Sequence, residues 1–74
     1  MDEGSDLDAS VGLFDGAADE LELAAQHCRT AAGHFLEREV PRGAAHAWAA
    51  LGHVLNAQEQ LERQARIHAG KSNP

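Results

Sequence analysis

The fold is decided by the stretch Val40-Pro41-Arg42-Gly43, which separates two long helical patterns in a chain of 74 residues. Proline disfavours α-helical geometry at the residue before it, so the first helix is expected to end near Glu39. Proline is also accepted in the first turn of a following helix, where no amide donor is needed. The stretch therefore predicts a short turn at 40–43 between two antiparallel helices, that is, an all-α helical hairpin.

Both sides of this turn have the apolar periodicity of an amphipathic helix, which predicts helices over residues 17–39 and 42–69 and a frayed tail over 70–74. The apolar stripe of the first helix recurs every three or four residues: Leu21, Ala25, Cys28, Ala32 and Phe35. That of the second helix contains Ala44, Trp48, Leu51 and Leu55. We expect Trp48 to anchor the core, with Phe35 near it. Cys28 is expected to be a buried, inert thiol.

The acidic charge is concentrated at the beginning of the chain. Residues 1–22 contain eight Asp or Glu and no Lys or Arg, whereas the whole chain has a net charge of −6. Residues 1–16 are therefore expected to be a flexible, solvated acidic segment, and the alternative is a docking peptide that folds on a protein partner. The helical spacing of Leu7, Val11 and Phe14 also allows a short helix there. No basic tract is present, so a nucleic-acid partner is not expected.

The composition favours association over an independent catalytic domain. Alanine accounts for 15 residues, and Leu, Ile, Val and Phe together for only 14. A core in a chain of this size contributes only ~3–5 kcal/mol. We therefore expect a homo-oligomer, a dimeric four-helix bundle, that self-associates through an Ala-rich helical seam and acts as a non-catalytic interaction or adaptor module. Its expected interface residues are Leu21, Cys28, Phe35, Trp48, Leu51, Leu55 and Leu61.

The sequence also bears on where the protein resides. A single cysteine excludes an intrachain disulfide and fits a reducing compartment. The acidic start Met1-Asp2-Glu3 does not have the character of a secretory signal. The apolar run 47–51 is far below the ~20 residues that cross a bilayer. We therefore expect a cytoplasmic protein without a membrane partner.

Four histidines are placed to face one another across the hairpin. His27 and His34 are seven residues apart on the first helix, and His46 and His53 are seven apart on the second. Facing residues of an antiparallel hairpin have numbers with a constant sum. The pairs 34/46 and 27/53 both add up to 80, and the pair 20/60 continues the series. The spacing thus predicts three rungs along one edge of the contact between the helices.

Two chemical roles fit these histidines. Imidazoles on facing helices are typical of a transition-metal site, here formed by His27, His34, His46 and His53. Two histidines per rung are fewer than the four ligands of a closed site, so Glu20, Cys28, water or a second copy would complete it. The other role is a pH-sensitive interface, because imidazoles become charged below about pH 6.5. A purely structural position at the edge of the core remains the simpler alternative, with no cofactor at all.

The segments 29–34 and 63–68 both consist of an arginine, four residues and a histidine. This pattern resembles the RNase motif of HEPN domains, in which such a pair acts on RNA at a dimer interface. The resemblance implies Arg29 and His34 as catalytic residues. HEPN domains are longer and have more helices than this chain provides.

The hairpin also resembles a single tetratricopeptide-type repeat over about 24 residues. The positions that match are Cys28, Ala31, Ala32 and Phe35 in the first helix and Ala44, Trp48 and Leu51 in the second. The large aromatic residue and Leu-Gly pair of that family's first helix are replaced by Cys28 and Ala31-Ala32. Arrays of this kind need about three units or more. The resemblance implies helix-hairpin packing and peptide binding.

Overall fold

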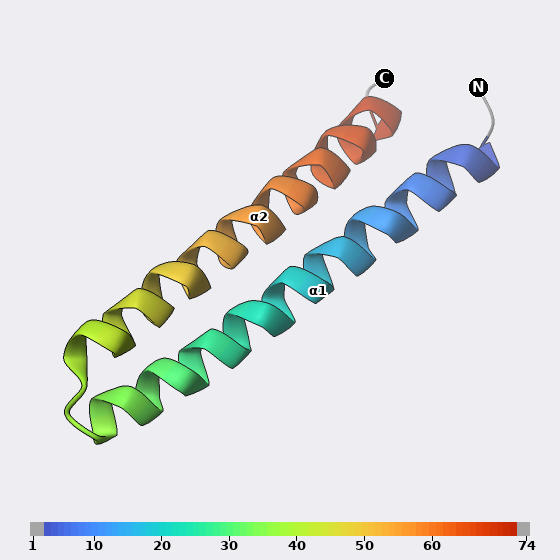
Figure 1. Ribbon diagram of the computed structural model, residues 1–74. Helices are drawn as coiled ribbons and strands as arrows, with labels where there is room; N and C mark the ends of the chain where they lie inside the picture. The colour runs from blue at the N-terminus through green and yellow to red at the C-terminus, as the bar shows by residue number, and fades with distance from the viewer. Residues whose placement is uncertain (1–2, 73–74) are drawn as a thin grey trace.

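A computed structural model describes residues 3–72 and shows an antiparallel hairpin of two long helices (Figure 1). Helix α1 spans Glu3–Leu36 and helix α2 spans Val40–Ser72. The helices run side by side, so the beginning of α1 and the end of α2 lie together, far from the connecting loop. The predicted all-α helical hairpin is confirmed.

The helix boundaries differ from those expected. The first helix begins at Glu3 instead of residue 17, so the acidic segment is, in its described part, the beginning of α1. Two physical reasons explain this: acidic side chains are favourable near a helix N-terminus, and Leu7, Val11 and Phe14 continue the helical periodicity. The second helix continues to Ser72, past the expected end at residue 69. Residues 1–2 and 73–74 of the two expected tails lie outside the described residues.

Helix α1 ends in a Schellman motif built on an arginine. The Glu39 amide donates a hydrogen bond to the His34 carbonyl at 2.8 Å, and the Arg38 amide donates one to the Phe35 carbonyl at 3.0 Å. This pair of bonds requires a left-handed residue at its centre, a place usually taken by glycine. Arg38 takes that place with φ of 66°. The chain therefore reverses direction at 37–39, before the expected turn at 40–43.

Helix α2 begins directly after this motif. Its first backbone hydrogen bond runs from the Gly43 amide to the Glu39 carbonyl, at 3.0 Å. Pro41 consequently lies in the first turn of α2, where its missing N–H group costs nothing. Pro41 was thus a correct signal for the boundary, but it belongs to the second helix rather than to the turn.

The left-handed conformation of Arg38 yields a stability prediction. A residue with a Cβ atom pays roughly 1–2 kcal/mol in this region, and glycine pays almost nothing. Arg38→Gly is therefore expected to raise the free energy of unfolding by about 1 kcal/mol, measured by urea denaturation. Arg38→Ala keeps the Cβ atom and serves as the control. A gain of equal size in both variants would show that the arginine charge, not the backbone, is responsible.

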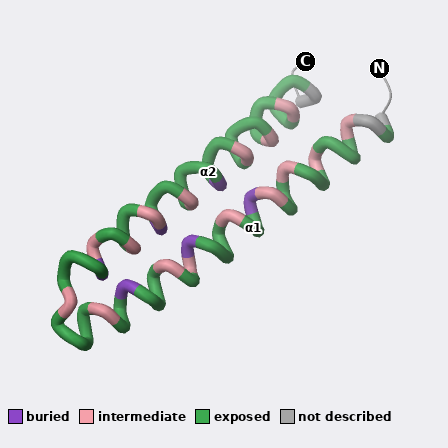
Figure 2. The backbone as a smooth tube through the Cα atoms, in the orientation of Figure 1, coloured by how far each residue is buried: buried purple, intermediate pink, exposed green. Residues whose placement is uncertain are grey.

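The two helices contact each other through small residues. The buried residues are Ala17, Ala24 and Ala31 on α1 and Gly43, Ala50 and Ala57 on α2, seven positions apart within each helix (Figure 2). A repeat of seven is the period at which one stripe of a helix keeps facing its partner. We call this line of contact the seam. Within the described residues, no large apolar side chain is buried in it.

Glycine positions show how closely the backbones approach. A Cβ atom added at Gly43 would lie 2.6 Å from the Phe35 ring and 3.3 Å from the Ala31 carbonyl oxygen. Nearer the open end, a Cβ atom at Gly16 would collide with the Gln60 side chain. Small residues on both helices permit this spacing, and a larger side chain in the seam would push the helices apart.

The apolar stripe expected between the helices instead faces outward. Trp48, expected to anchor the core, is 72% exposed, and Phe35 is 47% exposed. Cys28 is also exposed rather than buried. Each helix has two stripes that could form the contact, one of alanines and one of large apolar residues. The alanine stripe forms the seam because it allows closer backbone contact, and the large side chains are left outside.

The hairpin is elongated. Its extents are 55 × 20 × 12 Å and its radius of gyration is 16.8 Å. A compact domain of this length would have a radius of gyration of about 11 Å. A two-helix hairpin of this shape has no interior large enough to shelter its apolar side chains.

Candidate functional site

The seam divides the hairpin into two sides with different chemistry. On one side, longer polar residues alternate with the buried alanines: Glu20, His27 and His34 on α1 and His46, His53 and Gln60 on α2, all half-buried. On the other side, each buried small residue is followed four positions later by a residue of an exposed, mostly apolar column. These two sides are the candidate functional surfaces.

Four of the polar residues form one continuous stack of rings, which we call the histidine stack: His53, His27, His46 and His34, in that order. The ring centroids of His53 and His27 lie 5.4 Å apart, as do those of His46 and His34. In the middle, the Nδ1 atoms of His27 and His46 are 2.9 Å apart, a hydrogen-bond distance. One of these two nitrogens must therefore carry a proton while the other accepts it.

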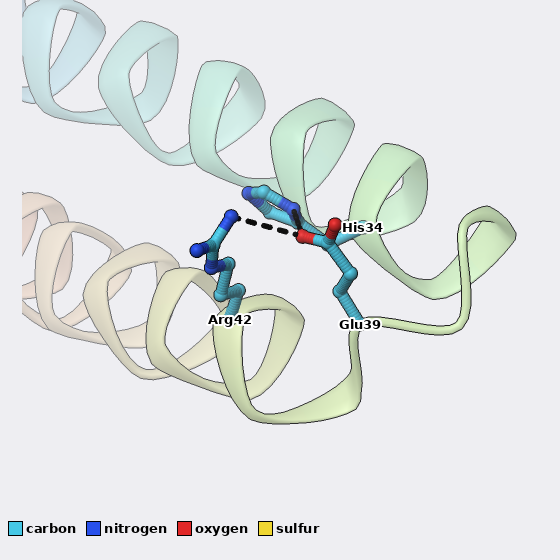
Figure 3. Close-up of polar contacts among 3 residues, drawn as sticks. All are labelled: His34, Glu39 and Arg42. Atoms are coloured by element: carbon cyan, nitrogen blue, oxygen red, sulfur yellow. Dashed lines mark hydrogen bonds and ion pairs between the residues drawn. The ribbon is translucent and has the colours of Figure 1, made fainter.

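A carboxylate closes each end of the histidine stack. At the open end, Glu20 Oε2 accepts a hydrogen bond from His53 Nδ1 at 2.5 Å. At the loop end, Glu39 Oε2 lies 3.1 Å from His34 Nδ1 and 3.3 Å from Arg42 Nη1 (Figure 3). The backbone of Glu39 hydrogen-bonds to both helices: its amide bonds the end of α1, and its carbonyl accepts the first bond of α2. Its side chain is therefore held beside the ring of His34.

The predicted rungs are close to what the structure shows, with one difference. The pairs 27/53 and 34/46 are the two stacked pairs of rings. Each inner ring, however, also contacts the other inner ring, because facing side chains interleave rather than meet singly. The expected third rung does not form between Glu20 and Gln60: Glu20 is bonded to His53 and Asn56, and Gln60 lies against Gly16.

The contacts of Glu20 lower its pKa. The hydrogen bond from His53 is the main cause; partial burial opposes it, and the hydrogen bond from Asn56 and the charge of His53 add to it. Because the unfolded chain then binds a proton more readily than the folded one, this contribution to stability is present above the ordinary carboxyl range. It is lost as the pH falls through that range toward the lower pKa of the folded state.

Glu20→Gln is expected to flatten the acid dependence of stability between about pH 5 and pH 3, the region around the ordinary carboxyl value. The measurement is thermal melting at several pH values, monitored by circular dichroism. Glu22→Gln, two positions away at an exposed site, is the control. Parallel curves for the wild type and Glu20→Gln would rule out this contribution from the carboxylate.

The residues of the expected metal site are brought together, but not as a closed set of ligands. Within residues 3–72, no group of three or more His, Cys, Asp or Glu side chains is placed to hold one metal ion. The imidazole rings of the histidine stack lie against one another instead of surrounding a common point. Cys28 lies on the opposite side of the seam. Metal binding by one chain would therefore need ligands from outside the hairpin.

The second side of the seam is apolar along most of the hairpin, up to Leu61 on α2, where the next position of the same spacing is the exposed His68. The α1 column contains Leu7, Phe14, Leu21, Cys28 and Phe35, and the α2 column contains Val40, Ala47, Val54 and Leu61. All nine residues are exposed. In both columns successive residues are seven positions apart, as in the seam beside them. We call these two columns together the apolar face.

A groove lies near the middle of the apolar face. Leu21 of α1 and Val54 and Leu61 of α2 line it, and the seam residue Ala57 forms part of its floor. The groove shows that the two columns are adjacent in space and belong to one surface. Monomeric proteins rarely expose a continuous apolar surface of this kind, which usually marks an interaction site.

The seven expected interface residues fall into two groups. Leu21, Cys28, Phe35 and Leu61 belong to the apolar face, and Leu51 borders it. Trp48 and Leu55 lie on the far side of α2, since they are two residues before and five residues after the seam residue Ala50. Sequence reasoning missed Leu7, Phe14 and Val54 as members of the same surface. Their spacing from Leu21 and Leu61, in multiples of seven residues, was the signal that could have found them.

The residues of the HEPN-like motif do not converge on one side of α1. Five residues turn a helix by about 140°, so Arg29 and His34 point in different directions. His34 lies beside the seam and is hydrogen-bonded to Glu39, while Arg29 is exposed. A catalytic pair would thus need a second chain to supply one of its members.

Comparison with protein-family models, with curated proteins and with solved structures gives no match. Within the described residues, neither helix is long and apolar enough to span a membrane. The resemblances to HEPN domains and tetratricopeptide repeats therefore stay predictions, and function must be argued from the two sides of the seam.

Proposed function

We propose that this chain is a non-catalytic interaction module that self-associates through its apolar face to form a four-helix bundle. One observation supports this above all others. Among residues 3–72, every buried hydrophobic residue is an alanine, while thirteen large apolar side chains are exposed on the hairpin. The molecule thus has its main hydrophobic surface on the outside, where only another molecule can cover it.

The physical argument concerns stability. Burying a large apolar side chain contributes about 1.5–3 kcal/mol, whereas an alanine has little side chain to bury. Ordering each backbone residue costs about 1–2 kcal/mol. A seam of alanines and half-buried histidines alone is a weak counterweight for two long helices. A second hairpin on the apolar face would supply the missing burial and complete the arrangement of a four-helix bundle.

The experiment is to measure the melting temperature over a hundredfold range of protein concentration by circular dichroism. Association that stabilises the fold makes the midpoint rise with concentration. A concentration-independent midpoint, together with a monomeric mass, would end the proposal. A midpoint that rises only after a second protein is added would indicate an adaptor that works with a different partner.

Transition-metal binding is the second candidate. The observation that favours it is the contact of four imidazoles in one stack, with two nitrogens 2.9 Å apart at its centre. Further ligands would come from water or from another copy. Metal analysis of the purified protein, and melting with and without a chelator, decides this candidate. No bound metal and no shift in the midpoint would exclude it.

A further inference from the structure

Resting on the proposed self-association, we infer that the two hairpins pack with their loops at opposite ends, α1 on α1 of the second copy and α2 on its α2. The two-fold axis then crosses the hairpins at the level of Leu21 and Val54, where the groove lies. The alternative symmetric packing of the same faces keeps the loops at one end and places α1 on α2 of the second copy. The composition of the apolar face and the distribution of charge discriminate between the two.

Packing with the loops at opposite ends places large side chains of the middle of the apolar face against small ones. The five residues of the α1 column are evenly spaced about Leu21. Turning the column about that residue places Leu21 on its own copy, Phe14 on Cys28 and Phe35 on Leu7. On α2 the same operation places Val54 on its own copy, Leu61 on Ala47 and Val40 on His68. Phe14 and Leu61, which lie at one level, thereby each meet a small side chain.

Loops at the same end would match the side chains poorly. The hairpin register puts Phe14 at the level of Leu61 and Cys28 at the level of Ala47, because the facing numbers add up to about 75 in the seam. In this packing Phe14 would meet Leu61 of the second copy, and Cys28 would meet Ala47. Two large residues would crowd one level, and two small residues would leave a void at another, both of which cost stability.

The distribution of charge also favours packing with the loops at opposite ends. The open half of the hairpin, residues 3–20 and 56–72, contains eight Asp or Glu and three Lys or Arg. The loop half, residues 21–55, contains three of each and is neutral. Loops at one end would bring two halves of net charge −5 together within the ~10 Å that separates packed helices, about one Debye length. Opposite ends place each charged half against a neutral one.

The experiment is disulfide cross-linking in the dimer that sedimentation equilibrium first establishes. Phe14→Cys, which keeps the native Cys28, places the introduced thiol opposite Cys28 of the second copy, so mild oxidation is expected to convert most of the protein to a covalent dimer. The wild type, with Cys28 alone, and the double variant Phe14→Cys/Cys28→Ala are expected not to cross-link. In both controls the two thiols lie about 21 Å apart along the helix direction, far beyond the ~7 Å between Cα atoms that a disulfide tolerates.

A second pair of variants keeps the orientation and the proposed function separately testable. Val54→Cys/Cys28→Ala puts a thiol at the two-fold axis and is expected to cross-link to its own copy, which checks the result should Phe14→Cys fail to dimerise. Ala47→Cys with native Cys28 is expected to give no covalent dimer. A dimer that cross-links through the Ala47→Cys variant, and not through Phe14→Cys or the axial thiol, would overturn the inferred orientation and leave self-association intact. A monomeric wild type would remove both.

Discussion

Leu21→Asp is expected to dissociate the bundle and to lower the melting temperature markedly at micromolar concentration. Leu21 lines the groove of the apolar face and is 46% exposed in the single hairpin, so a second copy would cover its remaining surface. Covering this exposed half contributes about half of the free energy of full burial, and the loss counts twice in a symmetric dimer, about 1.5–3 kcal/mol in total. Because each 1.4 kcal/mol is a factor of ten in affinity, Kd should rise at least about tenfold.

The matched control is Leu23→Asp. Leu23 is on the same helix, two residues away, and is 40% exposed. It precedes the seam residue Ala24 by one position and therefore flanks the side of the histidine stack. The two variants share the substitution, the added charge and nearly the same level along α1, but they lie on opposite sides of the seam. Equal dissociation in both, measured by size-exclusion chromatography with light scattering, would mean that the apolar face is not the interface.

Ala50→Leu is expected to destabilise the hairpin itself by about 1–3 kcal/mol, the usual cost of extra methylene groups in a tightly packed contact. Ala50 is 5% exposed and lies in the seam between His46 and His53. A leucine there would force the helices apart and separate the rings of the histidine stack. Urea denaturation gives the loss in free energy, and the histidine signals in NMR spectra report whether the ring contacts survive.

Ala45→Leu is the control for this second variant, since Ala45 is an exposed residue of the same helix. Leucine and alanine have similar helix propensities, so little change is expected at an exposed position. If Ala50→Leu were as stable as Ala45→Leu, alanine would not be needed in the seam. The close approach of the helices would then have to be explained without it.

The hairpin could be predicted from sequence because its signals are local. Pro41 between two amphipathic patterns fixed the number of helices and placed their boundary within a few residues. The exact turn could not be predicted, because it depends on Arg38 taking a left-handed conformation that nothing in the sequence leads one to expect of an arginine. The helicity of residues 3–16 was underestimated, since glycines and many acids outweighed the periodicity of Leu7, Val11 and Phe14 in the sequence interpretation.

The choice of the seam was the larger error. Hydrophobicity favoured the stripe with Leu21, Phe35 and Trp48, whereas the helices join through Ala17, Ala24 and Ala31 and their partners on α2. Side-chain size was the relevant property, because small residues allow close contact of backbones. The facing histidines were found from a simple register argument, and the structure stacks them. That argument could not foresee the carboxylates of Glu20 and Glu39 that close the stack.

The most direct test of self-association is the native mass in sedimentation equilibrium at neutral pH, at micromolar concentration. The chain has a mass of 7.9 kDa. The proposal predicts twice that mass, with full helicity at the same concentration and a monomeric Leu21→Asp variant beside it. A helical, thermally stable particle of 7.9 kDa would contradict it, because the exposed apolar face would then be compatible with a stable hairpin on its own.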